Sequence, residues 1–121
     1  MEKILIVGCS KVMDNVCIAC SRCMVGFNRR EGTFEQYVDT DAELIGILGC
    51  GDCPGAGIVT RLAQVKLWNA PLGEKPTAVH VATCLMDHCP HKDTILAKIK
   101  AKVGVPVIEG SHPYKPENIY A

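Results

Sequence analysis

Three apolar runs in this chain each end at a cysteine, and this arrangement limits the possible folds more than any other feature. The runs ILIVG, LIGILG and AVHVAT are followed directly by Cys9, Cys50 and Cys84. Short runs of this kind, rich in Ile, Leu and Val, are typical of strands that are covered on both faces of a parallel sheet. In such a sheet the carboxyl ends of the strands face one crevice, where ligands bind. We therefore expect the three cysteines to meet at one edge.

The order of predicted elements indicates the fold class. Strands are predicted over residues 3–8, 43–49, 78–83 and 105–109, and helices over 56–68, 92–103 and part of 14–30. Because strands and helices alternate, we expect an α/β fold: a small three-layer α/β/α domain with a mainly parallel sheet of about four strands, similar to the flavodoxin and Rossmann folds. The length of 121 residues fits one domain, residues 1–121.

The helical periodicity also predicts which side chains are buried. The positions expected to face the sheet are Ile58, Leu62, Val65, Ile95, Leu96, Ile99 and Val103. Gly104 follows the last of them and is expected to cap its helix. Leu67, Trp68 and Leu72 allow two interpretations: an exposed apolar patch through which two copies form a homodimer, or packing of Trp68 in the core.

Charge and composition exclude several classes of function. The chain has 13 basic and 13 acidic residues and few aromatic ones, so we expect neither a nucleic acid nor a membrane as its partner. No apolar run is long enough to span a membrane, and the short apolar stretch near the start does not resemble a secretion signal. We therefore expect a cytoplasmic protein, in which eight cysteines indicate metal or redox chemistry rather than disulfides. A secreted disulfide scaffold is the less favoured alternative.

The motif CGDCPG carries the first candidate site. Cys50 and Cys53 are spaced so that both sulfurs can reach one metal ion, at about 2.3 Å per bond to zinc. Gly51 and Gly55 permit the backbone turns around such a centre, and Pro54 suits the start of a helix. The same spacing serves a redox dithiol, because a helix N-terminus favours the thiolate form. This motif alone does not decide between the two.

A second cluster, in the segment CLMDHCPH, follows the third predicted strand. Cys84 and Cys89 are too far apart in sequence for a simple redox pair but close enough to bind one centre, and Cys-Pro is frequent at iron–sulfur ligands. His91 is a candidate ligand or a hydrogen-bonding partner of one, and His88 a weaker candidate. His80 alternates within a strand, so we expect it to be a hydrogen-bonded core residue.

A third cluster consists of Cys17, Cys20 and Cys23. In a regular helix the three sulfurs would spread over an arc of about 120°, so they would not all reach one centre. In a loop they could close on one cluster, with a fourth ligand from Cys9, Cys50 or Cys84. Alternatively, Cys20 and Cys23 fill core space as small apolar side chains.

The chain resembles the CGGC-domain proteins, a family of small, cysteine-rich prokaryotic proteins. The segments that carry the resemblance are KILIVGC, CGDCPG and TC…CPH, in that order. The resemblance implies a metal-binding role, usually with zinc, and recurrent cysteines at Cys9, Cys17, Cys50, Cys53, Cys84 and Cys89, with His91 after the last. Asp52 stands where the family has its second glycine. The family implies no established reaction.

Together these patterns predict a metal-binding protein with a thiolate-rich centre at the carboxyl edge of the sheet. An iron–sulfur cluster is favoured and zinc is a close alternative, because thiolates outnumber histidines. Electron transfer, handling of metals or clusters, and sulfur chemistry are the roles considered, with a redox or metal-delivery protein as partner. The alternatives are a thiol–disulfide oxidoreductase using Cys50 and Cys53, and a structural zinc module. The number of centres and any substrate stay open.

Overall fold

The computed structural model describes residues 2–10, 21–51, 55 and 57–111, with only the backbone described at Cys84, Asp87 and His88. The strands are β1 (Glu2–Gly8), β2 (Ala42–Gly49), β3 (Ala78–Val81) and β4 (Val107–Glu109). The α-helices are α2 (Ser21–Asn28), α3 (Ile58–Asn69), α4 (Thr83–His88) and α5 (Lys92–Val103). Two 3₁₀ helices, η1 (Gly32–Tyr37) and η2 (Ala70–Leu72), follow α2 and α3.

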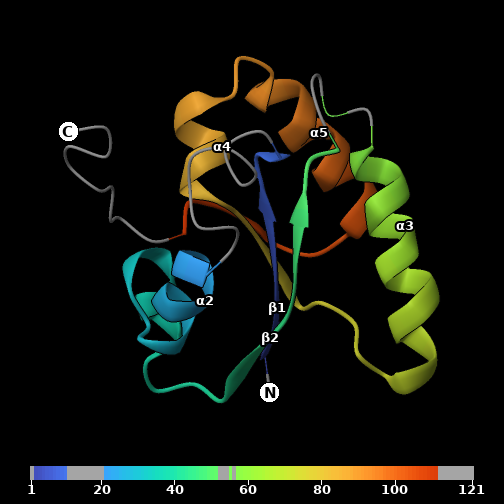
Figure 1. The fold of residues 1–121 in the computed structure, drawn as a ribbon. Coiled ribbons are helices and arrows are strands. Elements are labelled where there is room, and N and C mark those ends of the chain that lie inside the picture. Colours follow the sequence, from blue (N-terminus) through green and yellow to red (C-terminus); the bar gives the residue numbers. More distant parts are fainter. Residues whose placement is uncertain (1, 11–20, 52–54, 56, 112–121) are drawn as a thin grey trace.

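The four strands form one parallel sheet in the order β2-β1-β3-β4, which confirms the predicted α/β class (Figure 1). The central strand β1 pairs with β2 on one side and with β3 on the other. This central position explains why the run ILIVG contains no polar residue. Both faces of β1 are covered, so every side chain in the run is buried.

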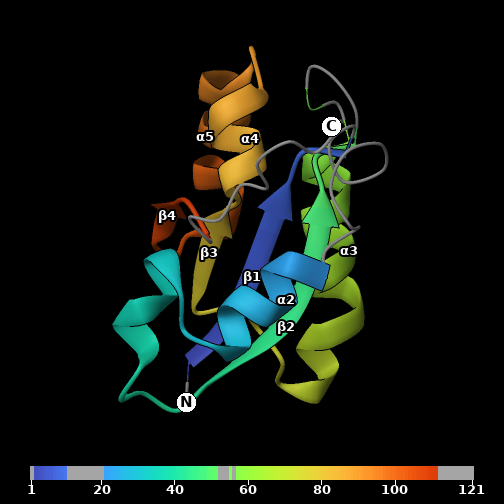
Figure 2. The same cartoon turned by 60° about the vertical axis from the view of Figure 1, so that its left-hand side comes forward.

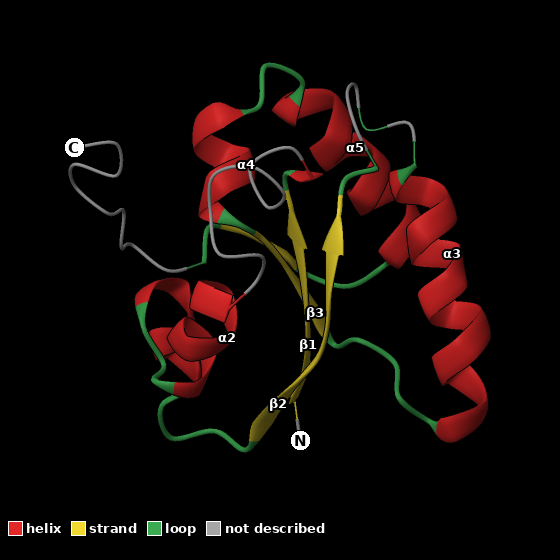
Figure 3. Ribbon diagram, in the orientation of Figure 1, coloured by secondary structure: helices red, strands yellow, loops and turns green. Residues whose placement is uncertain are grey.

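Helices cover both faces of the sheet, as predicted for three layers (Figures 1 and 2). Ile4 and Ile6 of β1 belong to a buried cluster with side chains from α2 and η1. Leu5 and Val7 point to the other face, into a cluster with side chains from α3 and α5. Figure 3 shows α3 and α5 together on one side of the strands and α2 on the other.

The predicted core positions of α3 and α5 are confirmed. Five of them are buried and two, Val65 and Val103, are partly buried against the same cluster. The bounds of α5 coincide with the predicted range 92–103, and Gly104 adopts the left-handed conformation, with φ of 63°. The predicted helix over residues 56–68 begins at Ile58 in the described part. Trp68 is 72% exposed, so the interpretation that packs it in the core is wrong.

The third strand is shorter than predicted. The range 78–83 was expected to be extended, but β3 ends at Val81. The carbonyl of Ala82 accepts hydrogen bonds from the amides of Leu85 and Met86, at 3.0 and 3.1 Å, so the chain turns at once into α4. Cys84 therefore lies in the first turn of a short helix and not at the end of a strand.

The last strand and the region after α2 also differ from the prediction. Strand β4 begins at Val107 rather than at residue 105, and Pro106, which precedes it, has no N–H to donate to a neighbouring strand. The 3₁₀ helix η1 was not predicted. It buries Phe34 and Tyr37 against the sheet. Its six residues are too few to show a helical periodicity in the sequence, so hydrophobic patterning did not predict it.

His80 is a hydrogen-bonded core residue, as predicted. It is fully buried, and its Nδ1 lies 2.9 Å from the Thr33 hydroxyl and 3.2 Å from the Gly110 carbonyl. Its Nε2 lies 2.9 Å from the Tyr37 hydroxyl. Burial lowers the pKa of His80, and the hydrogen bond with Gly110 offsets part of this effect. The ring is therefore neutral at pH 7.

Among the helices that the structure describes, none is both long enough and apolar enough to cross a lipid bilayer.

Candidate functional site

Cys9 and Cys50 lie side by side at the carboxyl edge of the sheet. Each follows the last residue of its strand, and those residues, Gly8 and Gly49, are register partners in the parallel pairing of β1 with β2. Both cysteines are buried, with exposed fractions of 7% for Cys9 and 2% for Cys50. The expectation that strand ends bring these two cysteines together is confirmed for this pair.

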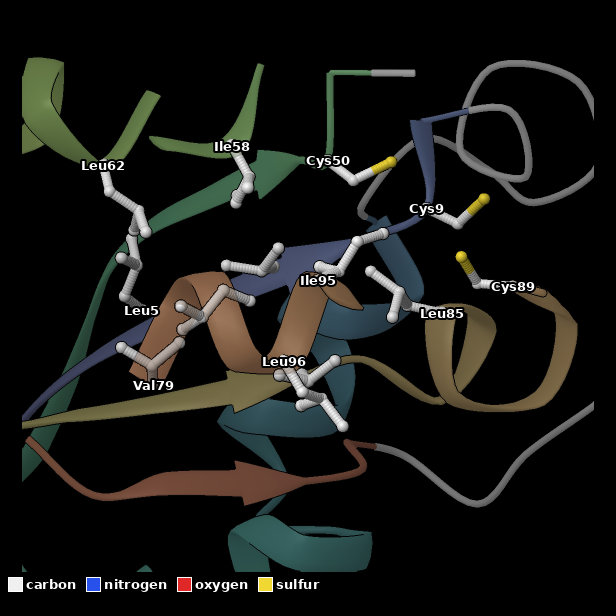
Figure 4. Close-up of a cluster of buried hydrophobic side chains, with 13 residues drawn as sticks. Leu5, Cys9, Cys50, Ile58, Leu62, Val79, Leu85, Cys89, Ile95 and Leu96 are labelled. Carbon is white, nitrogen blue, oxygen red and sulfur yellow. The ribbon is translucent and has the colours of Figure 1, made fainter. Parts of the chain in front are cut away.

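Cys89 joins the same edge from a different element. It is the residue that directly follows α4, and its amide donates to the carbonyl of Leu85 at 3.1 Å. Its side chain is 8% exposed and belongs to the same buried cluster as Cys9 and Cys50. Figure 4 shows the three sulfur atoms at one end of this cluster, beyond Leu85 and Ile95. Three segments far apart in sequence thus place cysteine sulfurs at one edge of the sheet.

Two glycines shape the loop that follows Cys50. Gly51 has a φ of +77°, and a Cβ at this position would lie 2.6 Å from the Cα of Gly57. Gly55 has a φ of +86°, and a Cβ there would lie 2.5 Å from Cγ1 of Ile95. Since both positions combine a left-handed backbone with a close neighbour, only glycine fits without strain. The predicted role of these glycines as turn residues is confirmed.

Ser10 is a site residue that the sequence patterns did not single out. Its Oγ accepts a hydrogen bond from the amide of Gly51 at 3.0 Å. The Cys50 thiol also donates to this oxygen, with 3.8 Å between Sγ and Oγ. Ser10 therefore connects the end of β1 to the turn after β2. Its position next to Cys9 was the only available signal, and a serine after a strand is too common to be informative.

Arg61 places a positive charge beside this loop. It lies on α3, and its Nη1 is 3.5 Å from the position that a Cβ of Gly49 would occupy. Its Nε is 3.6 Å from the corresponding position at Gly57. A guanidinium next to the Cys50 loop attracts negatively charged groups to this edge of the sheet.

The other candidate ligands either lie outside the buried cluster of these three cysteines or fall outside the described part of the chain. Cys23 lies on α2, half-buried against the cluster on the opposite face of the sheet. His91 is exposed at the residue before α5. Cys17, Cys20 and Cys53 lie outside the described residues, as does the side chain of Cys84. Within the described part of the chain, no three histidine, cysteine, aspartate or glutamate side chains stand close enough to hold one metal ion.

A comparison with protein families now identifies the domain. The family model described as the CGGC domain matches residues 3–112. The chain belongs to the CGGC domain family. The match includes Cys9, Cys50 and Cys89, and it includes Asp52, which replaces the second glycine of the motif in this CGGC domain. Comparison with curated proteins and with solved structures finds no match.

Proposed function

We propose that this CGGC domain binds a metal centre at the carboxyl edge of its sheet, with Cys9, Cys50 and Cys89 as ligands. The observation that carries the proposal is that three buried cysteines, which directly follow β1, β2 and α4, share one cluster. Buried cysteines often serve only as small apolar residues. Here the three sulfurs gather at the sheet edge where ligands bind in open α/β folds (Figure 4).

The ligand set is completed by a cysteine outside the described side chains. Cys53 is two residues beyond Gly51 in the CGDCPG motif, and Cys84 is five residues before Cys89. We propose that one or both close on the centre when it binds. Because Cys9, Cys50 and Cys89 do not stand close enough to hold one ion in the described structure, their sulfurs would also have to move together on binding. Such a change is in keeping with the coupling of metal binding to folding.

The donor chemistry favours an iron–sulfur cluster over a zinc ion. All three donors at this edge are sulfur, while His91, the nitrogen donor that would suit zinc, is exposed. A cluster held by thiolates carries net negative charge, which the Arg61 guanidinium beside the Cys50 loop would stabilise. Such a cluster would supply electron transfer, cluster transfer or sulfur chemistry. A reducing compartment such as the cytoplasm would keep its thiols available.

A second candidate is a thiol–disulfide oxidoreductase that uses Cys50 and Cys53. Cys9 is favoured as a third, resolving thiol because it lies at the neighbouring strand end. In this reaction the two thiols would become a disulfide while the partner's disulfide takes up two electrons and two protons. The candidate predicts activity in protein that contains no metal.

Anaerobic purification followed by iron, zinc and acid-labile sulfide analysis distinguishes these functions. We expect iron and sulfide with broad visible absorption. Colourless protein that contains zinc would support the zinc site instead of the iron–sulfur cluster. Metal-free protein that reduces disulfides would support the oxidoreductase. Cys50→Ser and Cys89→Ser should each lose most of the metal. If both variants retain the metal content of the wild type, the proposed shared site is wrong.

A further inference from the structure

We propose that Ser10 is a positioning residue that holds the turn after Cys50, and that Gly49 lacks a side chain in order to admit the Ser10 hydroxyl. This inference deepens the proposed function, because it explains how one metal ligand is oriented. It makes a separate prediction about the metal-free protein, so it can be tested even if the centre is absent.

Ser10 Oγ contacts two consecutive residues that directly follow β2. This oxygen accepts one hydrogen bond from the Gly51 amide, at 3.0 Å, and another from the Cys50 thiol, at 3.8 Å. Gly51 is the first residue of the turn with a positive φ. One hydroxyl therefore contacts both residues that determine where the Cys50 sulfur points. The turn has no strand partner beyond Gly49, since the pairing of β1 with β2 ends there.

Gly49 has no side chain, and the Ser10 hydroxyl occupies the space where one would lie. A Cβ built on Gly49 would collide with Ser10 Oγ and lie 3.4 Å from Ser10 Cβ. Gly49 is not among the glycines with positive φ, so its backbone is one that any residue can adopt. The collision would be with one atom, the hydroxyl oxygen, while the distance to Ser10 Cβ is ordinary van der Waals contact. The hydroxyl is therefore the reason for glycine at this position.

Residues that orient metal ligands affect the affinity of a metal centre. Their loss typically lowers metal affinity by about 10–100-fold, although they do not touch the metal. Without the hydroxyl, the Gly51 amide loses its acceptor and the Cys50 side chain loses one fixed contact. We expect Ser10→Ala to weaken metal binding about tenfold while all cysteines remain present.

The decisive experiment measures exchange of the Gly51 amide with solvent by NMR, in metal-free protein kept reduced. We expect Ser10→Ala to speed this exchange at least about tenfold, because the amide loses its acceptor. Ser10→Thr keeps the oxygen and should retain slow exchange. Thr60→Ala removes an exposed hydroxyl from α3 and should change nothing. Unchanged Gly51 exchange in Ser10→Ala overturns the proposal.

A double-mutant cycle tests the link between Ser10 and Gly49. Gly49→Ala should lower the melting temperature in the wild type but have a much smaller effect in the Ser10→Ala background, where the colliding oxygen is absent. Equal effects in both backgrounds contradict the proposed reason for glycine. Cobalt or iron titration of the same variants supplies the third measurement. If the wild type binds no metal, the proposed function fails, but the exchange and cycle results still decide the role of Ser10.

Discussion

The phenolic oxygen of Tyr37 lies 2.9 Å from Nε2 of His80, and both residues are buried on the α2 side of the sheet. The Thr33 hydroxyl donates to the Gly110 carbonyl, so its proton is not available to His80. His80 Nδ1 therefore carries the ring proton and donates toward these oxygens, which leaves Nε2 as the acceptor of the Tyr37 hydroxyl. Burial raises the pKa of Tyr37, so the phenol keeps the proton that it donates.

Replacing Tyr37 by Phe should destabilise the protein by about 1–3 kcal/mol, because the buried Nε2 of His80 loses its donor. The shape of the ring is retained, so the packing against the core should change little. Urea denaturation followed by circular dichroism measures the difference. Glu35→Gln, an exposed change in the same 3₁₀ helix, is the control and should have little effect. A Tyr37→Phe variant as stable as the wild type would contradict this account of the hydrogen bond.

The buried imidazole predicts how stability depends on pH. Because the pKa of His80 is lowered from 6.5 in the folded state, the unfolded chain binds the proton more readily in the range below that value. The contribution of the neutral His80 to stability should therefore be fully present above pH 6.5 and be lost as the pH falls from 6.5 through the lowered pKa. Free energies of unfolding measured by urea titration across this range test the direction. His80→Gln should flatten the decline, whereas His91→Gln, a change at an exposed histidine, should preserve it.

Gly55 of the CGDCPG motif should tolerate alanine poorly. Its φ of +86° costs a side chain about 1–2 kcal/mol, and the contact with Ile95 adds about 1–3 kcal/mol of overpacking. Gly73 is the matched control, because it has a φ of +75° but no atom within 4 Å of a built Cβ. Gly55→Ala should therefore be more destabilising than Gly73→Ala when both are measured by thermal or urea unfolding. Equal losses would show that the contact with Ile95 is unimportant.

The position of Cys23 predicts that its replacement affects metal content less than replacement of Cys50. Cys23 packs with the cluster on the α2 side of the sheet, away from the cluster that holds Cys9, Cys50 and Cys89. Cys23→Ala should leave the metal content unchanged and cost only about 1 kcal/mol of stability, since the residue is half-buried. Cys50→Ala should lose most of the metal. Equal loss of metal from both variants, measured after anaerobic purification, would rule out a centre confined to the Cys50 side.

Local patterns were sufficient to predict the parts of the fold whose signals lie within one segment. The range 92–103 predicted α5 with its bounds, because apolar side chains at helical spacing and a terminal Gly104 are both local signals. The end of β3 was not predictable in this way. The apolar run continues to Ala82, but the carbonyl of that residue already accepts hydrogen bonds from α4. Apolar character alone does not distinguish a strand from the buried first turn of a helix.

The candidate site was predicted in part. The strand ends predicted the meeting of Cys9 and Cys50, because parallel strands align their carboxyl ends. Cys89 was a candidate from its motif, but its place beside the other two follows from the length and direction of α4. The position of Cys23 also had to come from the structure, because a helix after a strand can pack on either face of the sheet.

The sequence by itself determined that this chain alternates buried strands with helices and carries cysteines where two of those strands end. Hydrophobic periodicity and turn residues act over a few neighbouring positions, so they can be recognised without a structure. Only the tertiary structure decided which sulfurs share an edge, and that the Ser10 hydroxyl occupies the space beside Gly49. These relationships join residues about 40 or more positions apart, as between Ser10 and Gly51, and such contacts depend on packing of the whole sheet.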